Sequence, residues 1–207
     1  MHRGAGMKNK TKNQVFIAHR RSVDGEIQNL WVHLSEVANL TGIFSSKIGL
    51  QKLGELVGLL HDVGKASFEF QQYISSATGL INSDEDDYVD ATQWKGKIDH
   101  STAGAQLVYS HLSNKGKSVW ASQILPLIIA SHHSGLIDCL TPDGQDAFSN
   151  RMKKSDGKTH LEEVLRNLDE DIRQRVMELL SDDTIIQSLN EKLTSMREDN
   201  DSRDILL

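Results

Sequence analysis

The amino-acid sequence predicts an all-α fold, and three observations lead to this prediction. Apolar residues recur at the three- and four-residue spacing of helices in several separate segments. No segment has a convincing strand pattern. The stretches between the periodic segments are rich in Gly, Ser and Asp. The 207 residues are enough for one domain or at most two small ones.

The first two predicted helices bring a histidine and a His-Asp pair into apolar surroundings. Apolar residues at helical spacing predict a helix over residues 30–44, with His33 on its apolar face. Residues 53–60 form a second, strongly apolar helix that ends near His61 and Asp62. Gly64 is close enough to end or bend it.

The remaining helices are predicted from the second half of the chain. Residues 103–112 and 119–130 form two helices, and Pro126 is expected to kink the second. Residues 160–198 carry further helical patterns, with a break at residues 181–183 and a last helix over 185–196. Residues 75–99 and 141–158 lack periodicity and are predicted to be long loops, the first leading into His100.

Composition narrows the class of protein. With one cysteine, Cys139, no internal disulfide is possible, which fits a reducing cytoplasm. The longest apolar stretch, residues 124–130, is far too short for a membrane span, and the N-terminus has no apolar signal region. Residues 1–14 are expected to form a tail, partly vector-derived or reflecting an alternative start at Met7, before a single domain over 15–207.

The net charge of −6 is a mild objection to a nucleic-acid ligand, because phosphate contacts need a basic surface. The charge is uneven, however. Basic residues gather at 8–21, 95–97, 115–117 and 151–158, and acidic residues at 84–90 and 162–204. Bound divalent cations would add local positive charge that this formal count omits.

The residues most indicative of function are the histidines that follow one another in a fixed order with one aspartate. A carboxylate has two oxygens and can bridge two cations, as two-metal hydrolysis of phosphate esters requires. Imidazole suits Mn, Fe, Co, Ni and Zn, and carboxylate shifts the preference towards the harder ions. Five of the nine histidines belong to the set, which is His33, His61, Asp62, His100, His132 and His133.

Each candidate has a structural alternative. A lone histidine on an apolar helix face, such as His33, is more often a core residue than a ligand. Asp62 could cap a helix, although a buried carboxylate needs a partner. His132 and His133 could be cations at a helix C-terminus. Both can reach one site only near a helix end, which Ser134 and Gly135 would supply, or across two metals.

Lys65 lies one turn after His61 on the same side of a helix. Its ammonium could stabilise the charge of a phosphoryl transition state. The alternative is a surface lysine whose aliphatic stem packs on the core.

These residues make the chain resemble the HD-superfamily metal phosphohydrolases. More narrowly, it resembles the HD nuclease of the type I CRISPR interference machinery, which accompanies a DNA helicase. The matching stretches are FIAH at 16–19, WVHL at 31–34, GLLHDVGKA at 58–66, FQQYI at 70–74, DHS at 99–101 and ASHHSGL at 130–136.

The resemblance implies an HD-domain helical bundle with long loops around a metal centre. One or two divalent transition metals are expected: Mn, Co, Ni or Fe, with Mg as a further option. Asp62 and Lys65 are the implied catalytic residues, and Asp62 bridges the metals. His33 and His61 complete one ligand set. His100, His132 and His133 complete the other, and His19 is expected to be a supporting residue.

The implied activity is metal-dependent endonuclease and exonuclease cleavage of single-stranded DNA in antiviral defence. The implied partners are a helicase domain or subunit and a CRISPR effector complex, in the prokaryotic cytoplasm. Two alternatives remain open. One is a small-molecule HD phosphohydrolase acting on nucleotides, and the other is a metal-binding module without catalysis.

One departure from the family concerns a late aspartate that normally follows an apolar run. Asp199, Asp201 and Asp204 lie in a polar stretch, and residues 205–207 look like the beginning of the expected helix. We therefore expect a fragment of a larger nuclease–helicase, truncated at its C-terminal end. The first metal is then expected to bind weakly or not at all.

Overall fold

The fold is given by a computed structural model that describes residues 15–94, 96–114, 118–133 and 135–203. The predicted N-terminal tail, Ser134 and residues 204–207 lie outside the described residues. Side chains are described as far as residue 197, so the structure does not place the carboxylates of Asp199 and Asp201.

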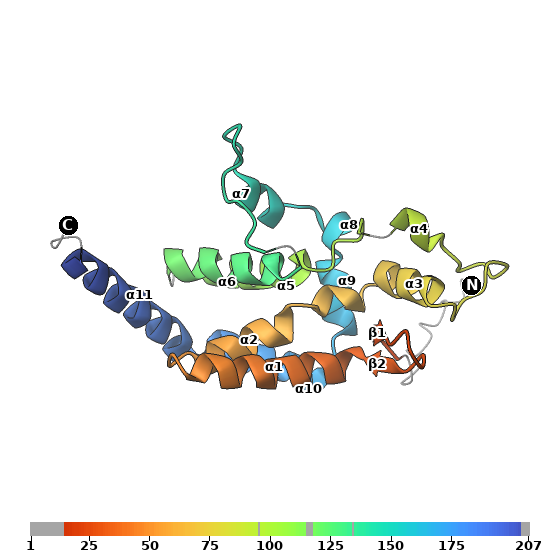
Figure 1. Cartoon of the computed structure of the whole chain (residues 1–207), viewed down its shortest axis with the longest axis horizontal. Helices are drawn as coiled ribbons and strands as arrows, with labels where there is room; N and C mark the ends of the chain where they lie inside the picture. Colours follow the sequence, from red (N-terminus) through yellow and green to blue (C-terminus); the bar gives the residue numbers. More distant parts are fainter. Residues whose placement is uncertain (1–14, 95, 115–117, 134, 204–207) are drawn as a thin grey trace, which may run out of the picture.

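A pair of helices forms the base of the molecule, and both were predicted from apolar periodicity. Helix α1, Leu30–Ser46, begins after Asn29, whose side chain accepts hydrogen bonds from the first-turn N–H groups of Trp31 and Val32. A short turn leads into α2, Gln51–Leu60. The two helices lie side by side (Figure 1), with Leu34 of α1 completely buried.

The close approach of α1 and α2 depends on a glycine. A Cβ atom added at Gly58 would lie 2.4 Å from Oγ1 of Thr41 and 2.5 Å from Cα of Ala38. Both distances are below any real contact, so only glycine allows the backbones to pack here. This packing holds the histidine of α1 near the C-terminal end of α2.

A second pair of helices packs on the first. Helix α5, Thr102–Asn114, and helix α6, Val119–Ser131, contact each other, and α6 also contacts α2. Pro126 lies inside α6, which is one helix from Val119 to Ser131. Val108, Leu125 and Ile129 are completely buried and join the two pairs into one core.

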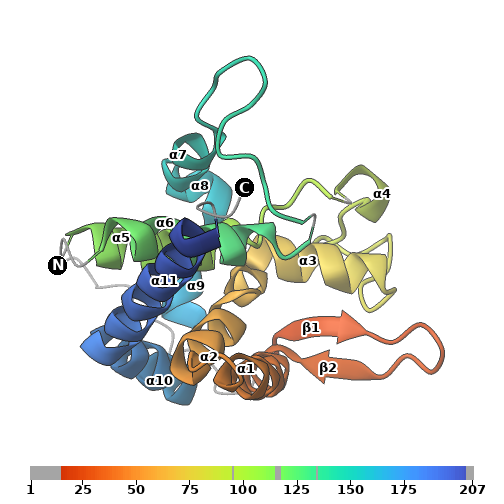
Figure 2. The ribbon, with the colours of Figure 1, turned by 60° about the vertical axis from the view of Figure 1, so that its left-hand side comes forward.

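A two-stranded hairpin was not predicted. Strand β1, Ile17–Arg20, pairs antiparallel with β2, Ile27–Asn29. The hairpin projects beside the beginning of α1 (Figure 2). The expectation of no strand was wrong because strands of four and three residues are too short to show an alternating pattern.

Short helices also interrupt the two predicted loops. A 3-10 turn, η1 (Val63–Ala66), precedes α3, Phe68–Ala77, and α4, Ala91–Trp94, lies inside the first loop. Helices α7, Ala147–Met152, and α8, Asp156–Thr159, lie inside the second. Loop predictions failed there because four or six residues cannot display helical periodicity.

The C-terminal helices agree with the predicted patterns. They are α9, Leu161–Asn167, α10, Glu170–Ser181, and α11, Asp183–Arg203. Asp182 lies at the predicted break, and its side chain accepts hydrogen bonds from the N–H and hydroxyl of Thr184. Helix α11 then extends away from the other helices (Figure 1). Among the described residues, no helix has the length and apolar character that a membrane crossing needs.

We predict that Gly58→Ala lowers the melting temperature. Overpacking at a close helix contact costs about 1–3 kcal/mol, which is about 2–12 °C for a protein of this size. The matched control is Gly157→Ala in α8, where an added Cβ meets open space. Circular dichroism melts of both variants would show the difference, and equal melting temperatures would refute this account of the α1–α2 contact.

Candidate metal centre

The structure brings all six predicted ligand residues together around the carboxylate of Asp62. They come from separate elements whose ends or faces meet at one point. His33 lies on α1, and His61 follows the last residue of α2. His100 precedes α5, and His132 follows the last residue of α6, with His133 beside it. The side chain of Asp62 is only 3% exposed.

The two oxygens of Asp62 face different sets of side chains. Toward Oδ2 lie Nζ of Lys65 at 2.8 Å and Nε2 of His33 and His61 at 3.2 Å each. Toward Oδ1 lie Nε2 of His132 at 3.2 Å, His100 at 3.6 Å and His133 at 3.9 Å. The carboxylate therefore stands between two groups of nitrogen donors. The resemblance implied the same division of ligands, whereas occupancy by metal stays a prediction.

The tautomers of two rings follow from the helix ends that carry them. The last carbonyls of a helix have no partner within it. Nδ1 of His61 lies 2.7 Å from the carbonyl oxygen of Gly58, and Nδ1 of His132 lies 2.7 Å from that of Ile129. Because a carbonyl can only accept, each Nδ1 donates its proton. In the neutral rings Nε2 then carries the lone pair that faces Asp62.

This arrangement places acceptors against acceptors. A neutral Nε2 and a carboxylate oxygen at 3.2 Å repel each other unless the ring is protonated or a cation lies between them. Nε2 atoms also approach each other, at 3.2 Å between His33 and His61 and at 2.5 Å between His100 and His133. A divalent cation that shares these lone pairs relieves the repulsion, so the donor set fits a metal.

The charge states of the side chains agree with this donor set. Burial alone would raise the pKa of Asp62, but hydrogen bonds from His132, His33 and His61, formed when these rings carry a proton on Nε2 in place of a bound metal, lower it far below its usual value. Burial lowers the pKa of His100 to about 4. Near neutral pH the site therefore combines an ionised carboxylate with a neutral imidazole, the forms that bind metals.

Within the part of the chain that the structure describes, two groups of residues have ligand atoms mutually within 4.8 Å and could hold a metal ion. One is Asp62 with His100, His132 and His133, and the other is Asp62 with His19 and His33. His19, expected only to support the centre, thus lies among the potential ligands. His61 contacts the same oxygen as His33 but is not part of the second group.

Lys65 is an internal residue of the centre. Its side chain is 3% exposed, and its ammonium lies 2.8 Å from Oδ2 of Asp62, 3.2 Å from Nε2 of His19 and 3.3 Å from the carbonyl oxygen of Ala18. The alternative of a surface lysine is therefore wrong. Its positive charge faces the carboxylate from the protein interior.

The His100 segment is held against the Asp62 segment by backbone packing and is tied to the segment after α7 by an ion pair. A Cβ atom on Gly64 would lie 2.1 Å from the carbonyl oxygen of His100, so only glycine permits this approach. Asp99 accepts hydrogen bonds from the N–H and hydroxyl of Thr102 and pairs with Lys154. The approach of Gly64 to His100 and the pairing of Asp99 with Lys154 were not predicted, because both join segments distant along the chain.

Gln71 is a further residue whose role was missed. Its buried side chain accepts from the N–H of Ile17 at 2.8 Å and donates to the carbonyls of Ile17 at 3.0 Å and Lys65 at 2.7 Å. It therefore ties β1 to the turn that carries Lys65. Gln71 belongs to the FQQYI stretch, but the sequence does not indicate which other segment of the chain the Gln71 side chain contacts.

His160 lies outside this centre and has other partners. Its Nε2 atom is 2.8 Å from Oε2 of Glu69, and its backbone has a φ of 53°, in the left-handed region. It therefore offers a histidine remote from Asp62 for control experiments.

The family model described as "Cas3, HD domain" matches residues 18–198, which include every described residue of the centre.

We predict that Gln71→Ala destabilises the protein by about 1–3 kcal/mol, because it leaves buried backbone groups without partners. The expected fall in melting temperature is about 2–12 °C. The neighbouring half-buried Gln72 provides the control, and Gln72→Ala should stay within about 0.5 kcal/mol of the parent. Thermal melts of both variants test this, and an unchanged Gln71→Ala protein would contradict the proposed tie.

We predict that the metal-free protein loses stability as the pH falls from about 6.5 to about 4. In the unfolded chain His100 binds a proton as the pH falls through this range. In the folded protein the pKa of His100 is about 4, so His100 stays neutral until the pH is near 4. One such group contributes up to about 1.4 kcal/mol per pH unit. Urea unfolding in EDTA should therefore show a shallower pH dependence for His100→Gln. Parallel pH profiles would argue against the lowered pKa.

Proposed function

Because this chain belongs to the family of Cas3 HD domains, we propose that it cleaves phosphodiester bonds of single-stranded DNA at the Asp62 centre. Family membership identifies a CRISPR-associated, metal-dependent hydrolase that acts on nucleic acid. The choice of single-stranded DNA, the cleavage mode and the residue roles are parts of the proposal.

The observation that carries the proposal is the position of Asp62 between two donor sets. Each carboxylate oxygen faces at least two imidazole nitrogens. We propose that His33, His61 and Oδ2 hold one divalent metal, and that His100, His132, His133 and Oδ1 hold another. When bound, two such metals supply Lewis acidity and a nucleophile derived from water at neutral pH.

The protein's own residues orient the reaction and balance its charge. Asp62 is fixed by its neighbours on both sides, and we propose that Lys65 keeps it ionised and oriented from the interior. Lys65 is enclosed at 3% exposure, so its charge acts on the reacting phosphate through Asp62. The backbone bonds of His61 and His132 hold both rings with Nε2 directed inward.

The exposure of the centre supports a polymeric substrate. The side chains of His33 and His61 are 12% and 13% exposed, whereas that of His133 is 53% exposed. The Oδ1 side therefore opens to the surface, where Arg151 and Lys154 lie beside the His100 segment. A strand can cross such an open site, and cations beside it can contact its phosphates.

The negative net charge of the chain supports the proposal that a partner delivers the DNA. The formal net charge is −6, and phosphate contacts supply most non-specific affinity for DNA. We therefore propose that a helicase domain or subunit, recruited by a CRISPR effector complex, feeds single-stranded DNA to this centre. The proposed metals are Mn, Co, Ni or Fe, with Mg as the harder option.

We predict that the protein nicks a labelled single-stranded DNA circle in the presence of Mn²⁺, Co²⁺ or Ni²⁺, and that EDTA abolishes the reaction. Asp62→Ala removes the shared ligand and should lower the rate by more than about 100-fold. A circle has no ends, so nicking demonstrates endonuclease activity. Gel electrophoresis of the products measures the rate.

The control variant is His160→Asn, which lies outside the centre and keeps a residue type that tolerates the left-handed backbone. It should cleave at the parent rate. Equal cleavage by Asp62→Ala would refute the site. A parent protein that hydrolyses nucleotides and leaves the circle intact would be a small-molecule phosphohydrolase, and one that binds metal without turnover would be a non-catalytic module.

A further inference from the structure

We infer that His19 is a direct ligand of the metal that lies on the Oδ2 side of Asp62. The inference rests on the proposed metal centre and adds a residue from the N-terminal hairpin to it. His33 and Oδ2 of Asp62 would share this metal with His19. The inference does not depend on any carboxylate outside the described residues.

The first support is distance. One ligand atom each of His19, His33 and Asp62 lies within 4.8 Å of the others. Two nitrogen or oxygen atoms bound to one metal, each about 2.1 Å from it, are at most about 4.2 Å apart. Shifts of less than about 1 Å therefore bring all three donors onto one ion. The rings of His19 and His33 already meet edge to face, with centroids 4.9 Å apart.

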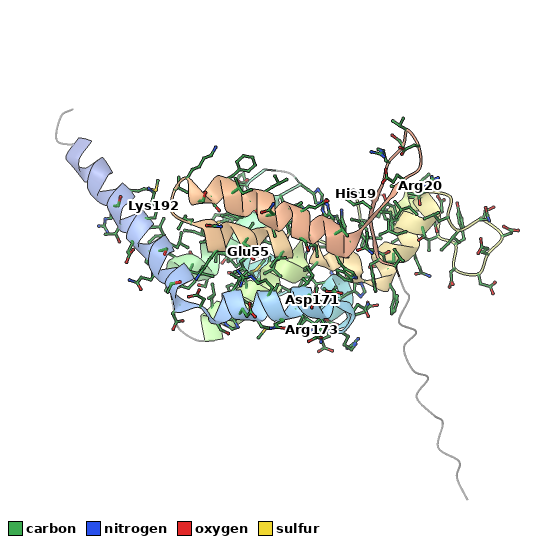
Figure 3. The ribbon with its side chains drawn as sticks, turned by 90° about the horizontal axis from the view of Figure 1, so that it is seen from below. His19, Arg20, Glu55, Asp171, Arg173 and Lys192 are labelled. Carbon is green, nitrogen blue, oxygen red and sulfur yellow. The ribbon has the colours of Figure 1, made fainter. Side chains whose placement is uncertain are left out.

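The second support is the local structure that directs His19 toward the centre. The strand register is irregular between Ile17 and His19, as at a β-bulge, and bulges re-aim side chains next to active sites. Ile17 is buried, whereas His19 is exposed. The tie from Gln71 to both backbone groups of Ile17 fixes this part of β1. Figure 3 shows His19 on the hairpin, beside the end of α1 where the helix begins.

Lys65 supplies the competing explanation for the position of His19. Nε2 of His19 lies 3.2 Å from the Lys65 ammonium, which donates to it, so the lone pair points inward. His19 could therefore serve only as an acceptor that positions Lys65. Metal binding through Nε2 instead requires the ammonium to give up this hydrogen bond while keeping those to Asp62 and Ala18. The two roles differ in whether the residue must be a nitrogen ligand.

Two substitutions separate these roles. His19→Gln retains a side chain that can accept a hydrogen bond from Lys65, but an amide is a poor ligand for transition metals. His19→Ala removes both properties. His160→Asn is the control for the loss of an imidazole elsewhere. Each protein is stripped of metal and titrated with Co²⁺, and the visible absorption and the heat of binding are followed.

We expect the parent to bind Co²⁺ at two classes of site. In His19→Gln one class should weaken at least about tenfold, with a changed Co²⁺ absorption spectrum, while the other class keeps its affinity. His19→Ala should behave alike, and His160→Asn should match the parent. Because His19→Gln keeps an acceptor for Lys65, its melting temperature in EDTA should match that of the parent. The gain in melting temperature on adding Co²⁺ should be smaller.

Parent-like Co²⁺ binding by His19→Gln would overturn the inference, and a loss confined to His19→Ala would assign His19 to positioning Lys65. The readout needs no substrate, so it is independent of DNA cleavage. Weakened metal binding in His19→Gln, together with a parent that does not nick DNA, would leave this inference standing and reject the proposed function. A parent that binds no Co²⁺ would overturn both.

Discussion

The enclosed carboxylate of Asp62 imposes the strongest physical constraint on this protein. A buried ion is unfavourable unless charges and hydrogen bonds surround it. Here Lys65 lies 2.8 Å from one oxygen, and imidazole nitrogens approach both. The helices are arranged so that these groups converge. The hairpin, the 3-10 turn and the segment before α5 all contact this one side chain or the lysine behind it.

Helix ends are the device that places the imidazoles. His61 and His132 each follow the last residue of a helix and use the carbonyl three residues earlier to fix the ring. The unpaired carbonyls of a helix terminus thereby become orienting groups for potential ligands. Since α2 and α6 pack against each other, the two ends meet at the same carboxylate. The same contact between a histidine Nδ1 and a helix-terminal carbonyl thus occurs twice around Asp62.

Periodicity predicted the parts of the structure that contain enough residues to display it. The helices that carry His33, His61 and His132 have apolar faces that the sequence alone locates. The hairpin and the helices α7 and α8 could not be predicted, because each element has six residues or fewer. The burial of Lys65 was equally inaccessible to pattern analysis, since lysine is rarely buried and two of its partners, Ala18 and His19, are distant along the chain.

The resemblance and the order of the histidines predicted the six candidate ligands. They did not predict the residues that hold these ligands in position. Gln71, through Ile17, and the pair of Asp99 and Lys154 act through contacts between segments far apart in sequence. Such contacts leave no spacing signal in a single chain. Gly64 was interpreted as a helix-ending residue, whereas its lack of a side chain serves the backbone of His100. The residues that hold the candidate ligands in place therefore could not be predicted from local patterns.

The residues that surround Asp62 are far apart in the sequence, and this affects how fast a bound metal ion would exchange with the solution. His33 contacts Asp62 across 29 residues and His132 across 70, so an ion held by either set would cross-link non-local parts of the fold. On the enclosed Oδ2 side, where His33 and His61 are 12% and 13% exposed, an ion would leave when packed helices separate or when the hairpin edge opens. Its residence time would then report the local opening of the protein, and isotope exchange would measure dynamics as well as affinity.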